Sequence, residues 1–218
     1  MKKFITCMTL QKKLSAYRYE AKGNDALEYE NETSFPIMTA IHGYVEENEQ
    51  YKVIVIMQDT DDCKANLEAL KNELKALSES TGKPYPQEIV VVSAGQSQSV
   101  SSNIDLFQNL IEYVEDEDEL FADITFGTKT MSMSLLTAIR YANRLLKRVS
   151  VKCIVYGEID RSVSEDPKEW KAYVYDETAM LSLDEITSTL ARQGVRNPKE
   201  LINFIIEFGN EDGGDSDE

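Results

Sequence analysis

Histidine is almost absent from this chain, since His42 is the only one among 218 residues. Sites that need two or more imidazoles, such as histidine-rich metal centres and two-histidine nuclease sites, are therefore excluded within it. Cysteine is also scarce, and Cys7, Cys63 and Cys153 share no C-x-x-C spacing. That spacing argues against a zinc site and against a disulfide framework. We expect no bound metal, and we expect His42, in a predicted helix, to serve in packing.

The glycine-rich phosphate motifs are missing as well. A strand-to-helix junction past the middle of the chain has one glycine, Gly127, two residues before Lys129. It matches neither G-x-x-x-x-G-K-[ST] nor G-x-G-x-x-G, so a nucleotide triphosphatase or a standard dinucleotide enzyme is disfavoured. We therefore expect no cofactor.

Long apolar runs and positive charge are both in short supply. No apolar run approaches the ~20 residues of a membrane span, so we expect a cytoplasmic protein. The chain has 23 Lys and Arg against 39 Asp and Glu, a formal net charge of −16. This balance disfavours general adhesion to duplex DNA or to an anionic membrane, although one anion can still be held in a locally basic pocket.

What the chain does have is a regular alternation of strand-like and helix-like segments, which indicates an open, mainly parallel α/β sheet of the Rossmann-like class. An inserted β-hairpin is predicted before the second strand, from alternating runs on either side of K-G-N-D. The third predicted strand, E-I-V-V-V-S, is expected to be buried. The six predicted strands are Phe4–Leu10, Tyr51–Met57, Glu88–Ser93, Leu120–Thr125, Val149–Tyr156 and Tyr173–Asp176, and the hairpin arms are Leu14–Ala21 and Ala26–Glu32.

Residues 1–181 are expected to form this Rossmann-like domain. Within it, Thr33 or Ser34 should cap a helix whose first turn holds Pro36. Residues 182–208 are predicted to be a short helical extension in two pieces. Residues 209–218 are acidic and glycine-rich with nothing to bury, so we expect a disordered tail.

The junction around Gly127 carries the strongest functional signal. The strand Leu120–Thr125 ends in polar residues, and the apolar spacing from Met131 to Leu146 predicts an amphipathic helix after the turn. A helix N-terminus offers free backbone N–H groups and a positive potential, so an anion is a suitable guest. Lys129 would add a formal charge there. The alternative interpretation is an ordinary capped helix with a solvated lysine.

Sheets of this class bind ligands at the carboxyl ends of the strands, where the strand order reverses. In a Rossmann-like order, the strands that end at Leu10 and Thr125 flank that point. We therefore expect the polar patch after the first strand, residues 11–13, to meet the junction around Gly127. This convergence favours the binding interpretation of Lys129.

Three segments resemble a known family. D-I-T-F-G-T-K at 123–129 resembles the D-x-T-H-G motif of CRISPR-associated Rossmann fold (CARF) proteins, with Phe126 where that motif has His. A-Y-R-Y-E-A and L-E-Y-E-N-E-T-S-F-P, within 16–36, are similar to the family's tyrosine-bearing hairpin and following helix. A-Y-V-Y-D-E-T-A-M-L at 172–181 resembles its V-x-D-x-T segment. The segments occur in the family's order, and the resemblance covers roughly Lys3 to Leu190.

The resemblance implies a homodimeric sensor of cyclic oligoadenylate, the messenger of type III CRISPR antiviral defence, with four or six adenylates in the ring. A ring with two-fold symmetry suits an isologous dimer, in which each subunit presents the same pocket. The loop after the third strand is a further candidate, with a plain flexible loop as the alternative. The ligand-binding residues implied are Thr9, Leu10 and Gln11 after the first strand, Gly95, Gln96 and Ser97 after the third, and Thr125, Gly127, Thr128 and Lys129 after the fourth.

Most CARF proteins carry an effector, yet this chain contains no R-x₄₋₆-H motif of the usual fused RNase. Three functions remain open. The first is a sensor that passes its signal to a separate effector protein. The second is a ring nuclease, in which the ribose 2′-OH attacks the adjacent phosphate without a metal and Lys129 stabilises the developing charge. The third is a transcriptional regulator that uses the C-terminal helices, although their few basic residues disfavour duplex DNA.

Overall fold

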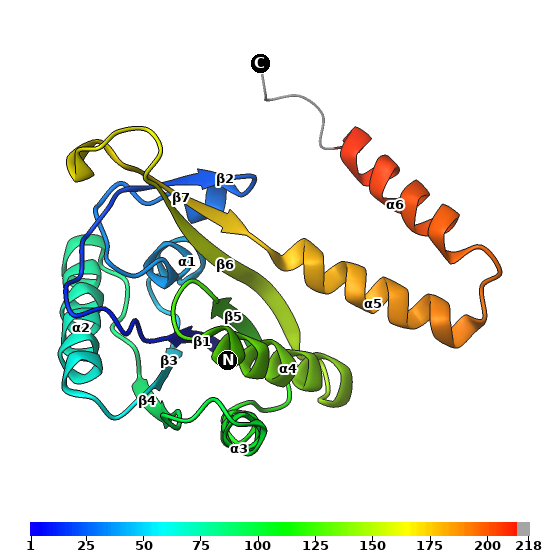
Figure 1. Ribbon diagram of the computed structural model, residues 1–218, viewed down its shortest axis with the longest axis horizontal. Coiled ribbons are helices and arrows are strands. Elements are labelled where there is room, and N and C mark those ends of the chain that lie inside the picture. The colour runs from blue at the N-terminus through cyan, green and yellow to red at the C-terminus, as the bar shows by residue number, and fades with distance from the viewer. Residues whose placement is uncertain (213–218) are drawn as a thin grey trace. The chain divides into compact units, whose positions relative to one another are not determined.

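The computed structural model describes residues 1–212, with side chains up to Glu207. The chain divides into two compact units, one of Met1–Thr178 and one from Ala179 onward. The first unit is built around a seven-stranded sheet with the strand order β2-β7-β6-β5-β1-β3-β4 (Figure 1). The α/β class and the mainly parallel sheet expected from the sequence are confirmed.

The elements follow one another in regular alternation. The strands are β1 (Lys2–Cys7), β2 (Tyr19–Lys22), β3 (Tyr51–Met57), β4 (Glu88–Ser93), β5 (Glu119–Asp123), β6 (Ser150–Asp160) and β7 (Lys171–Asp176). The helices are α1 (Ile37–Tyr44), α2 (Asp61–Thr81), α3 (Val100–Ile111), α4 (Lys129–Leu145), α5 (Thr178–Gln193) and α6 (Pro198–Asp212), with 3₁₀ turns η1 (Asp25–Leu27) and η2 (Pro167–Glu169).

The central strands are apolar because helices cover both faces of the sheet. Residues of α1 and α2 pack against one face of the sheet and form the main core with it. In this core the rings of Phe4 and Phe121 stack with centroids 4.4 Å apart. On the opposite face, Ala142 of α4 packs against Leu120 of β5, and α3 lies alongside α4 (Figure 1). The strand pairs are parallel except for β6 with β7.

The predicted hairpin before α1 is wrong. Its first arm contributes β2, which pairs in parallel with β7 at the sheet edge, and its second arm begins with the turn η1. The Asn24 side chain accepts the Ala26 N–H and so caps η1 where a hairpin turn was expected. In place of a hairpin ladder, one isolated antiparallel bridge pairs Tyr17 of the first arm with Thr33, just past the second arm, and Arg18 and Glu30 form an ion pair at 3.2 Å. β2 therefore has as its partner a strand that is distant in sequence, and not the neighbouring arm.

Two local expectations also need correction. The strand β4 was expected to be buried, but it lies at the sheet edge, and Val91 is 45% exposed. Neither Thr33 nor Ser34 caps α1, since the residue before the helix is Pro36 and no side chain caps it. The Thr33 hydroxyl instead accepts the Phe35 N–H at 3.0 Å and donates to the Glu73 carboxylate, because this segment turns before the helix begins.

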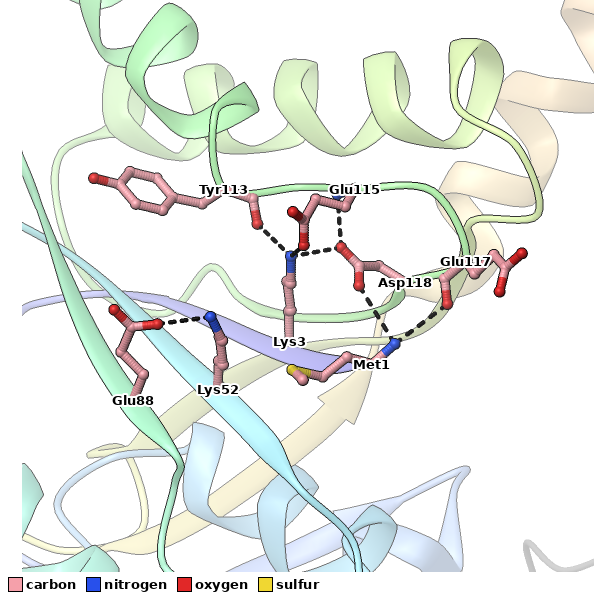
Figure 2. Close-up of polar contacts among 8 residues, drawn as sticks. All are labelled: Met1, Lys3, Lys52, Glu88, Tyr113, Glu115, Glu117 and Asp118. Carbon is pink, nitrogen blue, oxygen red and sulfur yellow. Dashed lines mark hydrogen bonds and ion pairs between the residues drawn. The ribbon is translucent and has the colours of Figure 1, made fainter.

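Charged residues join the amino ends of β1 and β5 (Figure 2). The Lys3 ammonium and the Asp118 carboxylate lie 2.7 Å apart, and each side chain is 3% exposed. Lys3 also donates to the Tyr113 carbonyl at 2.8 Å and to Glu115 at 3.0 Å. The Met1 amino group lies 3.4 Å from Asp118. A buried charge is tolerated when it is paired. This network therefore links β1 to the segment before β5 at the amino edge of the sheet.

The second unit contains α5 and α6, separated at Gly194, which has a φ of 63°. The break therefore falls where the sequence placed it, between Gly194 and Pro198. Helix α6 runs to Asp212, so the expected disordered tail overlaps its last four residues, and residues 213–218 lie outside the described part. Within residues 1–212, no helix is both long enough and apolar enough to cross a membrane.

Candidate ligand-binding site

The turn that follows β5 lies against the end of β1 at the carboxyl edge of the sheet, whereas the meeting of residues 11–13 with this turn stays a prediction. The two strands are neighbours, paired in parallel up to Thr6 opposite Asp123. The turn after β5 rests directly on the end of β1, because a Cβ atom at Gly127 would lie only 2.9 Å from the Cβ atom of Cys7. Gly127 also has a φ of 87°, a conformation that favours glycine. Glycine is thus required here for two independent reasons.

The first turn of α4 offers an anion both N–H groups and a cation. Thr128 caps the helix, since its hydroxyl accepts the Met131 N–H at 3.3 Å. The N–H groups of Lys129 and Thr130 have no carbonyl partner inside the helix, as at any helix start. The Lys129 side chain is exposed, and it forms no hydrogen bond or ion pair with the described residues. The Thr128 hydroxyl, in contrast, already accepts a hydrogen bond as the N-cap of α4, and it lies 3.0 Å from the Thr130 hydroxyl.

The segment after β1 is held rigidly by a residue that the sequence analysis missed. The Asn66 side-chain amide on α2 donates to the carbonyls of Thr9 and Gln11, each at 3.0 Å. The Thr9 hydroxyl accepts the Gln11 N–H at 3.2 Å, and Leu10 is 42% exposed. A signal for Asn66 was present, because a polar amide occupies the inward face of a helix beside Leu70. A buried amide needs hydrogen-bond partners.

Asp123, at the end of β5, holds the turn that follows through buried hydrogen bonds. Its carboxylate is fully buried and accepts the Thr125 N–H at 2.8 Å and the Thr6 hydroxyl at 3.1 Å. Burial raises the pKa of Asp123, while the hydrogen bonds from Thr125 and Thr6 oppose that rise. The Thr125 hydroxyl in turn accepts the Gly157 N–H at 2.8 Å, which links the turn to β6. Thr125 therefore positions the turn through its hydrogen bonds to Asp123 and Gly157.

The loop after β4 approaches the same helix start. Gly95, Ser97, Thr128 and Thr130 line one small pocket together, although Gln96 is not among its lining residues. The Gly95 carbonyl accepts from the Gln58 side chain at 3.4 Å. The structure therefore brings Gly95 near α4 and leaves Gln96 exposed on the loop.

A comparison with protein-family models identifies the family. Residues 9–160 match the model for the CARF domain of the CRISPR system endoribonuclease Csx1, which is more than half of the chain. The chain belongs to this CARF family. A search of curated proteins gave no match. The matched range contains every residue proposed for the site, from Thr9 to Lys129, and it identifies the first unit as a CRISPR-associated sensor domain.

The CARF domain departs from the usual motif at Phe126. Where the motif has His, this ring is partly buried and packs against the main core. It supplies no group that can exchange a proton. The neighbouring Cys7 is also unsuited to chemistry, because burial, with a smaller contribution from Asp123, raises the pKa of its thiol to about 12.

The CARF domain's other titratable candidates lie apart from this edge. His42 on α1 packs its ring against Tyr29 with centroids 5.0 Å apart, and its Nδ1 lies 3.1 Å from the Glu28 carbonyl oxygen. Burial lowers the pKa of His42, so the ring is neutral near pH 7. Within the described residues, no group of three or more His, Cys, Asp or Glu side chains could hold a metal ion.

Proposed function

We propose that this CARF domain binds cyclic oligoadenylate at the carboxyl edge of β1 and β5. The ring phosphates would contact Lys129 and the first N–H groups of α4, while residues 9–11 would form the opposite side of the pocket. Backbone N–H groups at a helix start and a neighbouring cation are both suited to phosphate.

The observation that carries the proposal is the unpaired charge of Lys129. Some lysines of this unit form ion pairs with carboxylates, as in the pairs Lys64–Asp59 and Lys71–Glu68. Lys129 is exposed and, like Lys147, has no such partner among the described residues, but of these two only Lys129 lies at the start of α4. A cation left unpaired beside a helix N-terminus leaves a local positive potential for an anion.

The same proposal includes a homodimer with the pocket across its two-fold axis. A ring that repeats itself by rotation can offer equivalent phosphates to two copies of Lys129. Light scattering with and without cyclic tetra- or hexa-adenylate tests this part. A monomer under both conditions would contradict it.

Among the functions left open by the sequence, we favour a sensor that signals to a separate effector protein. Phe126 replaces the only imidazole of the motif, and the hydroxyls of Thr125 and Thr128 already accept backbone N–H groups. Because Asp123 is fully buried, Lys129 is then the exposed charged residue of segment 123–129 that a cleavage step could use. A DNA-binding role is disfavoured because Glu200 and Glu207 of α6 would repel phosphates.

Calorimetry on Lys129→Ala is the test. A hydrogen bond to a charged group contributes about 1.5–3 kcal/mol, so two copies in a dimer would contribute roughly 3–6 kcal/mol if they add. We expect the affinity for the ring to fall about a hundred- to ten-thousand-fold. Thr9→Ala should weaken binding less than Lys129→Ala, because Thr9 is buried and its hydroxyl acts on the ring only through the Gln11 N–H that it accepts.

Lys147→Ala is the matched control, since Lys147 is an exposed lysine just past the other end of α4. Its ring affinity should stay at the wild-type value. Both variants should change the free energy of unfolding by no more than about 0.5 kcal/mol, the usual range for a surface substitution. If Lys129→Ala bound the ring like the wild type, our placement of the pocket would be wrong. Chromatography of the ring after incubation shows whether it is cleaved, and complete turnover would favour the ring nuclease instead.

A further inference from the structure

A group of tyrosines lies on an open part of the sheet beside the candidate site. Tyr156 on β6 is directly opposite Tyr175 on β7, and Tyr173 is two residues earlier on β7. Tyr156 is 41% exposed, and the other two are half-buried. We call these three residues the tyrosine surface. Three aromatic rings on an accessible sheet face offer a ligand a flat, largely apolar surface with polar hydroxyl groups.

The tyrosine surface is on the same face of the sheet as α4. Ala142 of α4 packs against Leu120, and Ala122 shares that face because it is two residues further along β5. Ala122 is paired with Ile154 of β6, and Tyr156 is two residues beyond it. Helix α4 also packs along β6 (Figure 1). The three tyrosine rings therefore lie on the face of the sheet that α4 covers.

The tyrosine surface adjoins the junction after β5. Tyr156 is the first residue of β6 beyond its pairing with β5, and the next residue, Gly157, donates its N–H to the Thr125 hydroxyl at 2.8 Å. From Thr125 to Lys129 the chain advances four residues, which spans at most ~14 Å. A ligand of nucleotide-ring size can therefore contact Lys129 and Tyr156 at once.

Polar groups surround the rings. The Tyr175 hydroxyl donates to one oxygen of Glu158 at 2.9 Å, and Glu158 is exposed. The Lys22 ammonium lies 5.1 Å from the centre of the Tyr173 ring. Glu158 thus provides a carboxylate acceptor two residues from Tyr156, on the same face of β6. An aromatic face beside an acceptor is suited to a flat heterocycle that carries an amino group.

We propose that a base of the ring ligand stacks on Tyr156 while Glu158 accepts a hydrogen bond from the exocyclic amine of adenine. This inference rests on the proposed function, because Lys129 and the helix start contact the phosphates of the same ligand. Aromatic side chains stack on any base, so Tyr156 contributes affinity. The carboxylate contributes base selectivity, because a base that lacks the amine leaves it without that donor.

Calorimetry with cyclic tetra- and hexa-adenylate tests the stacking. Loss of one stacked aromatic ring weakens binding about five- to hundred-and-fifty-fold per base, and we expect Tyr156→Ala to fall in that range. Tyr156→Phe keeps the ring and should bind within about threefold of the wild type. Lys129→Ala is measured alongside as the phosphate-contact reference. Glu158→Leu should reduce the preference for a cyclic oligoadenylate over the matching cyclic oligoinosinate, which lacks the amine.

The outcomes separate this inference from the proposed function. If the wild type binds, Lys129→Ala fails to bind and Tyr156→Ala binds normally, the stacking proposal is overturned and the pocket stands. If the wild type binds neither ring, the proposed function fails and the stacking proposal fails with it. If Tyr156→Ala changes the oligomeric state but not the affinity per site, the tyrosine surface is a subunit contact and the proposal is refuted.

A spectroscopic variant keeps the test independent of the fold of Tyr156→Ala. Trp170 is the only tryptophan, so Trp170→Phe removes the native indole. In that background, Tyr156→Trp places a fluorophore at the proposed stacking position. Saturating cyclic oligoadenylate should quench its emission, whereas inorganic phosphate should not. Unchanged emission at a ring concentration that saturates calorimetric binding would overturn the proposal.

Discussion

Removal of the Asp118 carboxylate should destabilise the first unit more than the loss of any exposed charge. Asp118 pairs with Lys3 at 2.7 Å and accepts the Glu115 N–H at 2.7 Å, and its side chain is 3% exposed. In Asp118→Ala, the Lys3 ammonium would stay buried with only the Tyr113 carbonyl and the exposed Glu115 carboxylate. A buried charge that loses its partner retains its desolvation cost without the compensating attraction.

The magnitude follows from that loss. Breaking a buried ion pair by removing one partner costs about 3–5 kcal/mol, and we expect this for Asp118→Ala. Lys3→Met should cost less, roughly 1–3 kcal/mol, because Asp118 keeps the Glu115 N–H and the Met1 amino group. In a unit of this size, about 3–5 kcal/mol lowers the melting temperature by roughly 6–20 °C.

Urea denaturation of the variants checks both values. The control is Lys52→Met, since the Lys52–Glu88 pair lies at the same edge (Figure 2) but its side chains are 29% and 53% exposed. That loss should be about 0.2–1 kcal/mol. Ring affinity should not change in any of the three variants, because the amino edge is opposite the proposed pocket. Our reasoning fails if Asp118→Ala costs no more than Lys52→Met.

Two further predictions concern the turn after β5. Gly127→Ala should lower stability by more than the roughly 1–3 kcal/mol of a positive φ, because the new methyl would also meet Cys7, and ring binding should be lost. Gly23→Ala, with a φ of 75° and nothing within 4 Å of the new methyl, is the control, and equal costs would contradict the close contact. Since burial raises the pKa of Asp123, its ionised form costs free energy in the folded state. The stability of the wild type relative to Asp123→Asn should therefore fall as the pH rises from about 3.9 to the raised pKa, and a difference that is flat across pH would refute the shift.

Local patterns were sufficient wherever a segment is decided by its own residues. The apolar runs Tyr51–Met57 and Glu88–Ser93 form β3 and β4 with the predicted bounds. The strand, glycine and amphipathic helix around Gly127 also form as predicted, because hydrophobic periodicity is a local property. The placement of β1 beside β5 followed from the topology common to such sheets.

The hairpin failed because strand partners are chosen across the whole sheet. Tyr19–Lys22 has the alternation of a hairpin arm, yet it pairs with β7, about 150 residues away in sequence. The burial of β4 was overestimated for a related reason, since an apolar run does not reveal whether a strand has one neighbour or two.

The sequence by itself determined the class of the fold, the order of its elements and the polar junction that includes Lys129, since each depends on residues close together in the chain. Only the tertiary structure decided which side chains hold that junction in place. Asn66 reaches residues 9–11 from α2, Gly157 reaches Thr125 from β6, and Tyr156 meets Tyr175 across two strands. Such contacts join residues far apart in sequence, and they exist only once the sheet has brought their strands and helices together.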